Sequence, residues 1–124
     1  MTQYFLTVPH SSADEPTMES MQQNDPAELE AVFAAVGAFN QALEESGALR
    51  YAAGLHPPST ARTVDATGSK TRVLDQPFVT AEEYVGGFWI IEVANDAEAL
   101  MWTTRAAEAL RARIEVRAVQ DPPA

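Results

Sequence analysis

The chain has 124 residues, no cysteine, and 18 acidic against 8 basic side chains, which gives a formal net charge of -10. The length is typical of a single domain, which we expect to span residues 1–124. The lack of cysteine excludes disulfides, thiolate metal sites and cysteine nucleophiles. An acidic chain without a basic stripe is a poor candidate for binding nucleic acid or an anionic membrane, so we expect neither partner.

The amino-terminal residues lack the basic start and the apolar run of a secretory signal. The longest purely apolar stretches, such as residues 88–91, are far shorter than the ~18 residues that a membrane helix needs. We therefore expect a cytoplasmic protein.

The first predicted elements are a strand and a long helix. Apolar and polar residues alternate over residues 3–8 and predict a strand that Pro9 ends. The polar residues 10–24 predict a flexible loop. Asp25, Pro26 and Glu28 then form a helix start, and Gly47 ends the predicted helix over residues 26–46. Its apolar residues at helical spacing are Leu29, Val32, Phe33, Val36, Phe39 and Leu43.

The middle of the chain reads as short strands and turns. Residues 50–56 predict a strand, and residues 60–65 and 70–74 predict a hairpin around residues 66–69. Residues 75–78 form a loop, and residues 80–83 have a capping-box pattern that predicts a helical turn. Gly86 and Gly87 break this turn before residues 88–94, the most apolar strand, which we expect to be central.

The last predicted elements are a helix and a strand. Asn95 is placed to cap the helix. Its expected buried face consists of Ala97, Leu100, Met101, Thr104 and Ala107, with Trp102 half exposed. Residues 113–118 alternate and predict the last strand, and residues 120–124 predict a disordered tail.

This order of elements predicts an α+β protein in which two helices cover one face of an antiparallel sheet. The strands carry bulky apolar groups in both phases, so Phe5, Trp89 and Ile91, or their alternates, must lie on the second face. We expect a homodimer that joins the two uncovered faces.

Seven stretches, in order, resemble a known family. They are Gly54-Leu55-His56-Pro57-Pro58, Thr60-Ala61-Arg62-Thr63-Val64, Gly68-Ser69-Lys70-Thr71, Asp75-Gln76-Pro77-Phe78, Gly86-Gly87-Phe88-Trp89-Ile90-Ile91-Glu92-Val93, Glu98-Ala99-Leu100 and Glu115-Val116-Arg117. Over roughly residues 3–119 the chain resembles the YCII-related family, in the branch named for its Asp-Gly-Pro-Phe motif. The resemblance implies a ferredoxin-like β-α-β-(β-hairpin)-β-α-β subunit of a dimeric α+β barrel. The wider superfamily includes muconolactone-type isomerases and related lactone enzymes.

The sequence departs from the family pattern at positions that matter for function. Gln76 replaces the glycine of the motif, although its place before Pro77 favours extended angles that any residue adopts. Thr80 stands where the branch has an acidic residue. The His and Asp that classical YCII proteins carry near the two helices, proposed there as a catalytic pair, have no counterpart in this chain.

Two residues are the candidate catalytic groups. Asp75 leaves a strand end and could act as a base on a carbon acid or lactone, or its oxygens could bond the amides of the next turn. His56, held before Pro57-Pro58, could shuttle protons or simply lie on the surface. If the two were within hydrogen-bond reach, they would replace the missing family pair.

Further side chains are candidate ligand contacts. They are Phe78, Tyr84, Trp89, Arg62 and His10. The aromatic ones could equally belong to the core or a dimer interface. Arg62, together with Arg72 and Arg117, could bind a substrate carboxylate or pair with Glu92 or Glu115 across strands. Glu83 is expected to complete the cap with Thr80. We expect no metal, because only two histidines are present, and no cofactor.

The leading hypothesis is a small ligand-binding or weakly specified catalytic domain of YCII type, with proton transfer or elimination on a small lactone-like carbon acid as its reaction. The alternative is a non-enzymatic regulatory module linked to transcription, because some relatives of this branch occur with sigma factors. The acidic first helix could then meet a basic protein surface.

Overall fold

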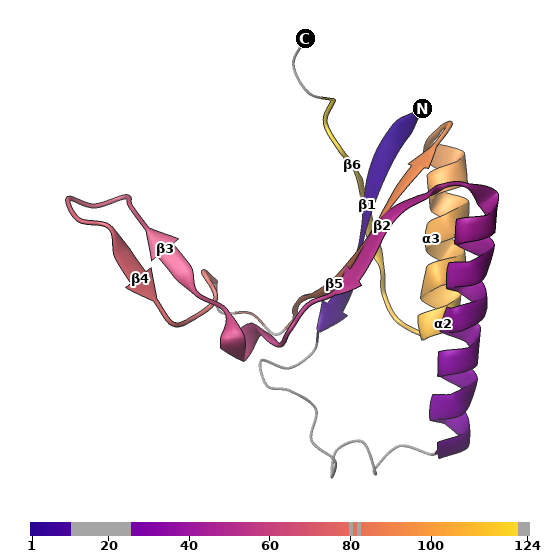
Figure 1. Ribbon diagram of the computed structural model, residues 1–124, viewed down its shortest axis with the longest axis horizontal. Coiled ribbons are helices and arrows are strands. Elements are labelled where there is room, and N and C mark those ends of the chain that lie inside the picture. The colour runs from indigo at the N-terminus through magenta and orange to yellow at the C-terminus, as the bar shows by residue number, and fades with distance from the viewer. Residues whose placement is uncertain (11–25, 80, 82, 122–124) are drawn as a thin grey trace.

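The computed structural model of the chain describes residues 1–10, 26–79, 81 and 83–121. The elements are β1 (Thr2–His10), α2 (Pro26–Ser46), β2 (Leu49–Gly54), the 3-10 turn η1 (Pro58–Thr60), β3 (Thr63–Asp65), β4 (Arg72–Leu74), β5 (Tyr84–Val93), α3 (Asp96–Leu110) and β6 (Glu115–Ala118). The two helices lie side by side on one face of the larger sheet (Figure 1). This order confirms the expected ferredoxin-like α+β fold.

The larger sheet has four strands in the order β2-β5-β1-β6, and neighbouring strands run antiparallel. Strands β1 and β5 occupy its centre, which confirms the central position predicted for the most apolar segment. Strands β3 and β4 form a separate two-stranded sheet. Their pairing confirms the predicted hairpin, with Val64 opposite Val73.

The core lies between the helices and the sheet. Its buried residues include Tyr4, Leu6, Phe39, Leu43, Trp89, Ile91, Val93, Ala99, Trp102 and Ala106. The Phe39 ring makes edge contacts with Trp89 at 5.4 Å and Trp102 at 6.1 Å between centroids. The Trp89 indole donates its N–H to Asn40 Oδ1 at 2.9 Å, so this large side chain is buried with its polar atom satisfied.

The register of the central strands decides which side chains reach this core. Trp89 stands opposite Leu6, and Ile91 stands opposite Tyr4, and all four are buried beneath the helices. Residues that pair directly share a face. Phe5 therefore lies on the open face of the sheet, as predicted. In β5 the residues on that face are Phe88 and Ile90, the neighbours of Trp89 and Ile91.

The buried face of α3 differs from the prediction. Ala99, Trp102, Thr103 and Ala106 are its buried residues, and Leu100 and Met101 are 56% and 42% exposed. Ala97 and Thr104 are exposed as well, and Ala107 is half-buried. A face built mostly of small residues lets the helix approach its neighbours closely, which a search for large apolar side chains misses. The predicted cap is confirmed, because Asn95 Oδ1 accepts a hydrogen bond from the Glu98 amide at 2.9 Å.

Helix α2 matches its predicted range. Phe39 and Leu43 are buried as expected, but Phe33 is 67% exposed. The predicted cap Asp25 and the predicted loop over residues 11–24 lie outside the described residues, and His10 belongs to β1 and not to that loop. In the described part of the chain, neither helix is long and apolar enough to cross a membrane.

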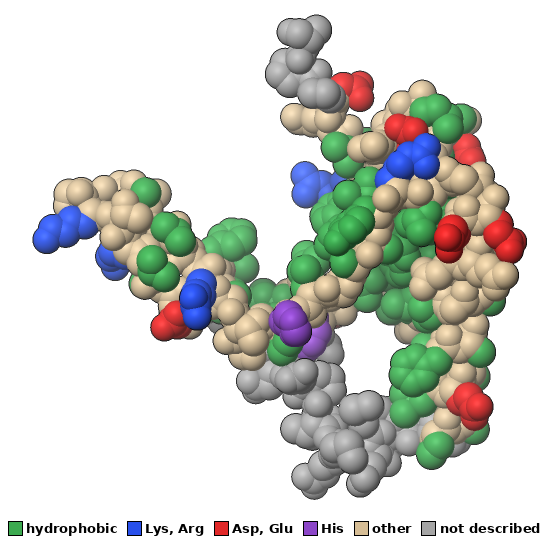
Figure 2. Space-filling view, in the orientation of Figure 1, with side chains coloured by type: hydrophobic (Ala, Val, Ile, Leu, Met, Phe, Trp, Pro, Cys, Tyr) green, Lys and Arg blue, Asp and Glu red, His purple; other side chains and the backbone are tan. Residues whose placement is uncertain are grey.

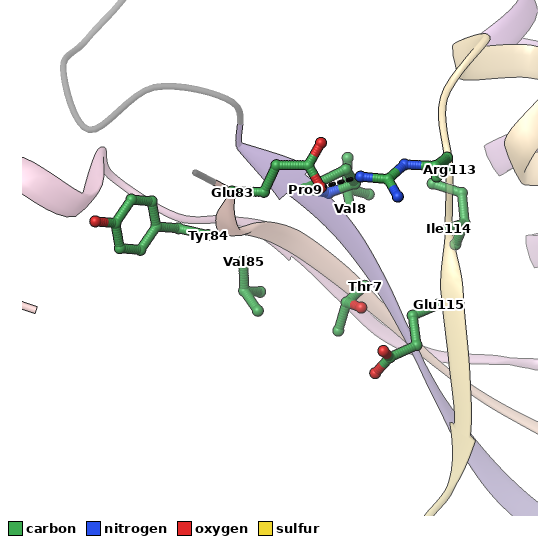
Figure 3. Close-up of a pocket in the computed structure, with 9 residues that line it drawn as sticks. All are labelled: Thr7, Val8, Pro9, Glu83, Tyr84, Val85, Arg113, Ile114 and Glu115. Atoms are coloured by element: carbon green, nitrogen blue, oxygen red, sulfur yellow. Dashed lines mark hydrogen bonds and ion pairs between the residues drawn. The ribbon is translucent and has the colours of Figure 1, made fainter. Parts of the chain in front are cut away.

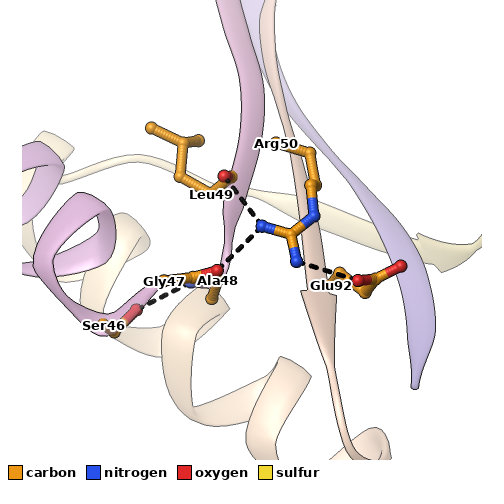
Figure 4. Close-up of polar contacts among 6 residues, drawn as sticks. All are labelled: Ser46, Gly47, Ala48, Leu49, Arg50 and Glu92. Carbon is orange, nitrogen blue, oxygen red and sulfur yellow. Dashed lines mark hydrogen bonds and ion pairs between the residues drawn. The ribbon is translucent and has the colours of Figure 1, made fainter.

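The end of α2 is fixed to the sheet by polar contacts (Figure 4). Gly47 has φ of 81°, the left-handed conformation predicted for the end of the helix. The Arg50 guanidinium donates to the Gly47 carbonyl at 2.8 Å and to the Glu92 carboxylate at 2.8 Å. Glu92 therefore pairs with Arg50, which lies at the register shift between Leu49 and Tyr51 where β2 meets β5. Arg62, Arg72 and Arg117 do not take that place.

Strand β5 runs through the glycines that were expected to precede it. It begins at Tyr84, and neither Ala81 nor Glu83 is helical, so the predicted turn is wrong at the described positions. Gly86 and Gly87 belong to the strand because neighbouring strands pack closely against them. A Cβ built on Gly86 would lie 2.9 Å from His10 Cβ, and one on Gly87 would lie 3.2 Å from the Ala53 carbonyl oxygen. Glycine is needed here for close approach of neighbouring strands.

We predict opposite effects for two glycine-to-alanine substitutions. Gly86→Ala should lower the free energy of unfolding by about 1–3 kcal/mol, because the added methyl overlaps β1. Gly37→Ala, in the exposed middle of α2 where the new Cβ meets nothing within 4 Å, should raise it by about 0.5–1 kcal/mol. Urea titrations measure both values. Equal effects of the two substitutions would contradict this packing.

Candidate functional site

A cavity of about 330 Å³ opens at one end of the larger sheet, where β1 ends, β5 begins and the chain enters β6 (Figure 3). Its lining residues are Thr7, Val8, Pro9, Glu83, Tyr84, Val85, Arg113, Ile114 and Glu115. Three segments that are far apart in the sequence thus meet around one hollow. Its walls combine apolar side chains with a few polar groups, which is typical of small-molecule sites.

A β-bulge shapes this cavity. The register of β1 with β5 shifts between Val8 and Pro9, so that Val8 faces Gly87, Pro9 faces Val85, and Gly86 is the extra residue. A bulge re-aims the side chains beyond it. In Figure 3, Val85 points to the same side of the sheet as Thr7. The shift in register thus brings an apolar group to the edge of the open face.

The polar groups of the cavity include an ion pair and a tyrosine hydroxyl. The Arg113 guanidinium donates to the Glu83 carboxylate across the end of β1. Both side chains are partly exposed, at 82% and 43%, so the pair contributes little to stability and can exchange contacts with a ligand. The Tyr84 hydroxyl accepts a hydrogen bond from the Ala81 amide at 3.1 Å, which leaves its own proton to donate.

Glu115 supplies a second carboxylate to the cavity. It stands directly opposite Thr7 in the pairing of β6 with β1. The site therefore offers N–H donors from Arg113, the Thr7 hydroxyl and a carboxylate that can accept a proton, whereas the Tyr84 hydroxyl points away from them (Figure 3). Such a set can hold a carbonyl oxygen and remove a proton from an adjacent carbon.

A second cavity of about 280 Å³ lies at the other end of β1, lined by Tyr4, Asp96, Leu100 and Val116 among others. The buried Tyr4 phenol donates to the Asp96 carboxylate at the start of α3. This hydrogen bond to Asp96, followed by burial, raises the pKa of Tyr4. Tyr4 therefore keeps its proton to a higher pH than an ordinary tyrosine, and its hydrogen bond ties β1 to α3.

The two predicted catalytic residues lie on the surface of the subunit. Asp75 follows the end of β4, and its side chain is 91% exposed. Its carboxylate meets Arg62 at 3.7 Å, and Arg62 lies in a loop and not on a strand. His56 is exposed between β2 and η1. In the part of the chain that the structure describes, no hydrogen bond or ion pair joins His56 to Asp75.

The predicted ligand contacts are spread over the molecule. Tyr84 lines the cavity beside Glu83 and Arg113, and His10 stands opposite Tyr84 at the end of β1. Trp89 belongs to the core, which was its alternative role, and Phe78 is 83% exposed. Only Tyr84 among these contacts therefore belongs to the cavity in Figure 3.

Sequence reasoning missed Arg113 and Glu115 as site residues and assigned Glu83 to a helix cap. Arg113 and Glu83 are 30 positions apart, and no motif links them. The useful signal was Gly86-Gly87 within an apolar run, because glycine inside a strand often marks a bulge. Within the described ranges, no three His, Asp or Glu side chains gather closely enough to hold a metal ion.

Comparison with known proteins gives one family. A family model described as the YCII-related domain matches residues 9–121, which is most of the chain. Among proteins with curated descriptions, none matches.

The Tyr4–Asp96 contact predicts that the free energy of unfolding depends on pH in the alkaline range. Because the pKa of Tyr4 is raised in the folded state, its stabilising effect is complete below the usual tyrosine pKa of about 10 and is lost as the pH rises through the higher folded value. The free energy of unfolding should therefore fall more steeply above about pH 10 in the native protein than in Tyr4→Phe.

Urea unfolding across this alkaline range measures the effect. Asp96→Asn keeps the Tyr4 phenol and removes the carboxylate that raises its pKa, so this second variant should reduce the same pH dependence. The same slope in Tyr4→Phe as in the native protein would refute the role of the Tyr4 proton.

Proposed function

The chain belongs to the YCII-related family, and we propose that it is a homodimeric protein that binds a small neutral carbonyl compound of the lactone type. We place the ligand in the cavity beside Glu83 and Arg113, with no metal or cofactor. One observation carries this proposal. A cavity with apolar walls and a few polar groups opens at the edge of an aromatic sheet face that no described helix or strand of the subunit covers.

The open face supports the proposed homodimer. The rings of Phe5, Phe88 and Tyr51 form a stripe across three strands, with centroids 5.3 Å and 5.8 Å apart. Tyr51 is 59% exposed, and hydrophobic side chains lie along this side of the sheet (Figure 2). Exposed apolar patches of this kind mark interaction surfaces. A second copy is the partner that offers the same aromatic stripe, as a two-fold interface requires.

Charge narrows the class of ligand. The protein has a net charge of -10, and the cavity itself has two carboxylates against one guanidinium. This field opposes the entry of anions. The donors at Arg113 and Thr7 suit a neutral carbonyl group, while Val8, Val85 and the other apolar walls suit a hydrocarbon ring.

Proton transfer is the reaction that these groups support. A carbonyl oxygen held by Arg113 would make the adjacent C–H more acidic, and the Glu115 carboxylate would take the proton. Asp75 and His56 stay candidates for the same task. Because both are exposed in one subunit, a catalytic role for either requires a second copy to enclose it.

The resemblance to the Asp-Gly-Pro-Phe branch supports a second, weaker proposal, a regulatory module that binds a basic protein in the cytoplasm. The exposed Phe33 on α2, near the acidic Glu28 and Glu30, is the surface that would serve it. Binding of the partner should then be lost in Phe33→Ser, whereas the lactone site should be unaffected.

The lactone site is tested with Arg113→Gln. NMR titration of the native protein with a panel of neutral lactones should give saturable shifts at Tyr84 and its neighbours. In Arg113→Gln the dissociation constant should rise by about tenfold or more, because a hydrogen bond from a charged donor contributes about 1.5–3 kcal/mol.

Arg111→Gln is the matched control. Arg111 is an exposed arginine at the end of α3, so this substitution changes the net charge equally and leaves the cavity intact. It should bind like the native protein. Two results would rule out this site. One is that no lactone shifts the NMR signals of the cavity residues in the native protein, and the other is that Arg113→Gln binds as tightly as the native protein.

A further inference from the structure

The hairpin of β3 and β4 projects from the molecule as an arm, which we define as residues 62–76. In Figure 1 it extends away from the four-stranded sheet, on the side opposite the helices. Its strands have three residues each and pair only with one another. A lone two-stranded hairpin is at best marginally stable in water. Packing against a further surface would therefore stabilise the arm.

One face of the arm is apolar and uncovered. Val64 and Val73 stand directly opposite each other, so their side chains lie on the same face, and they are 64% and 65% exposed. Phe78 and Val79 follow the arm at 83% and 49% exposed. A paired set of exposed valines on a protruding hairpin is suited to contact with another molecule.

The turn of the arm is held in shape by polar contacts. The Asp65 carboxylate accepts hydrogen bonds from the Thr67 hydroxyl at 2.5 Å and the Thr67 amide at 2.9 Å, and it pairs with Arg72 at 3.1 Å. These contacts, with that of the Thr67 hydroxyl the strongest, lower the pKa of Asp65. An arm ordered before it binds loses less entropy on binding.

The charge of the arm is opposite to that of the rest of the chain. The arm has three bases and two acids, whereas the remaining residues have five bases and 16 acids. A second copy of this chain therefore offers a surface of complementary charge. Figure 1 shows that the arm extends on the side of the sheet that the helices leave open, which is the side on which a second copy would pack.

We propose that the arm of each subunit packs against the second copy in the homodimer, with Val64 and Val73 in the contact. This inference rests on the proposed dimer through the open face and adds a second surface to it. It also places Arg62 and Asp75, at the base of the arm, next to the subunit interface.

The test removes the apolar groups and keeps the strand. In the Val64→Thr/Val73→Thr variant both residues remain β-branched, and both positions are exposed in one subunit, so the fold should persist by circular dichroism. Sedimentation equilibrium should show a dimer dissociation constant raised by about tenfold or more. The control Leu100→Gln/Met101→Gln removes two exposed apolar groups from α3 and should leave it unchanged.

A third variant separates failure of the arm contact from failure of the dimer. Tyr51→Thr alters the open face alone. If it weakens the dimer while the double valine variant does not, the arm contact is overturned and the dimer through the open face stands. If the native protein is a monomer, both are overturned.

A second measurement reports on the arm directly. Because the chain has no cysteine, Val73→Cys provides a single site for an environment-sensitive dye. The emission should shift to shorter wavelength as the protein concentration rises through the dimer transition. The same dye attached through Thr104→Cys, on the exposed side of α3, should not respond. Emission from the arm that is independent of concentration would overturn the proposal.

Discussion

The antiparallel pairing of β1 with β5 is the interaction on which the rest of the structure depends. It sets Leu6 opposite Trp89 and Tyr4 opposite Ile91, and these four side chains build the core with the helices. The same pairing turns Phe5 and Phe88 to the other side. One register thus produces both a closed core and an aromatic face without a cover.

The slip in this register produces the candidate site. Gly86 is the extra residue, and no side chain larger than hydrogen fits beside His10 at that point. Beyond the slip, Val85 turns toward the open face, and Glu83 reaches Arg113 across the end of β1. The cavity and the open face are therefore consequences of one strand pairing, which is why we assign them to one function.

The arm extends the same reasoning to the outside of the molecule. Its valine pair is uncovered for the same reason as the aromatic stripe, because the two helices of the described residues both lie on the other face of the larger sheet. In the homodimer that we propose, a second copy covers both surfaces at once. The residues outside the arm have a net charge of -11, which complements the charge of +1 on the arm.

Much of the fold could be predicted from the sequence, because local signals are strong. Asn95 marks the start of α3, and Gly47 marks the end of α2. The turn residues indicate the hairpin, and the apolar run indicates the central strand. The phase of that strand could not be predicted, since Trp89 and Phe88 are equally apolar and only the partner strand decides between them.

The candidate site was harder to predict than the fold. Tyr84, a candidate ligand contact chosen from its residue type, lines the cavity, but Arg113 and Glu115 enter the cavity only through long-range pairing. Such pairs leave no local pattern in a single sequence. The prediction for the buried face of α3 failed because it favoured large apolar residues such as Leu100 and Met101. The face that packs consists mostly of small residues such as Ala99 and Ala106, which permit closer packing.

The central claim is that a second copy covers the open face of the sheet. Sedimentation equilibrium of the unmodified protein over a range of concentrations tests it most directly. We predict a particle of twice the 13.4 kDa chain mass, dissociating on dilution. A mass of 13.4 kDa at every concentration would contradict the account.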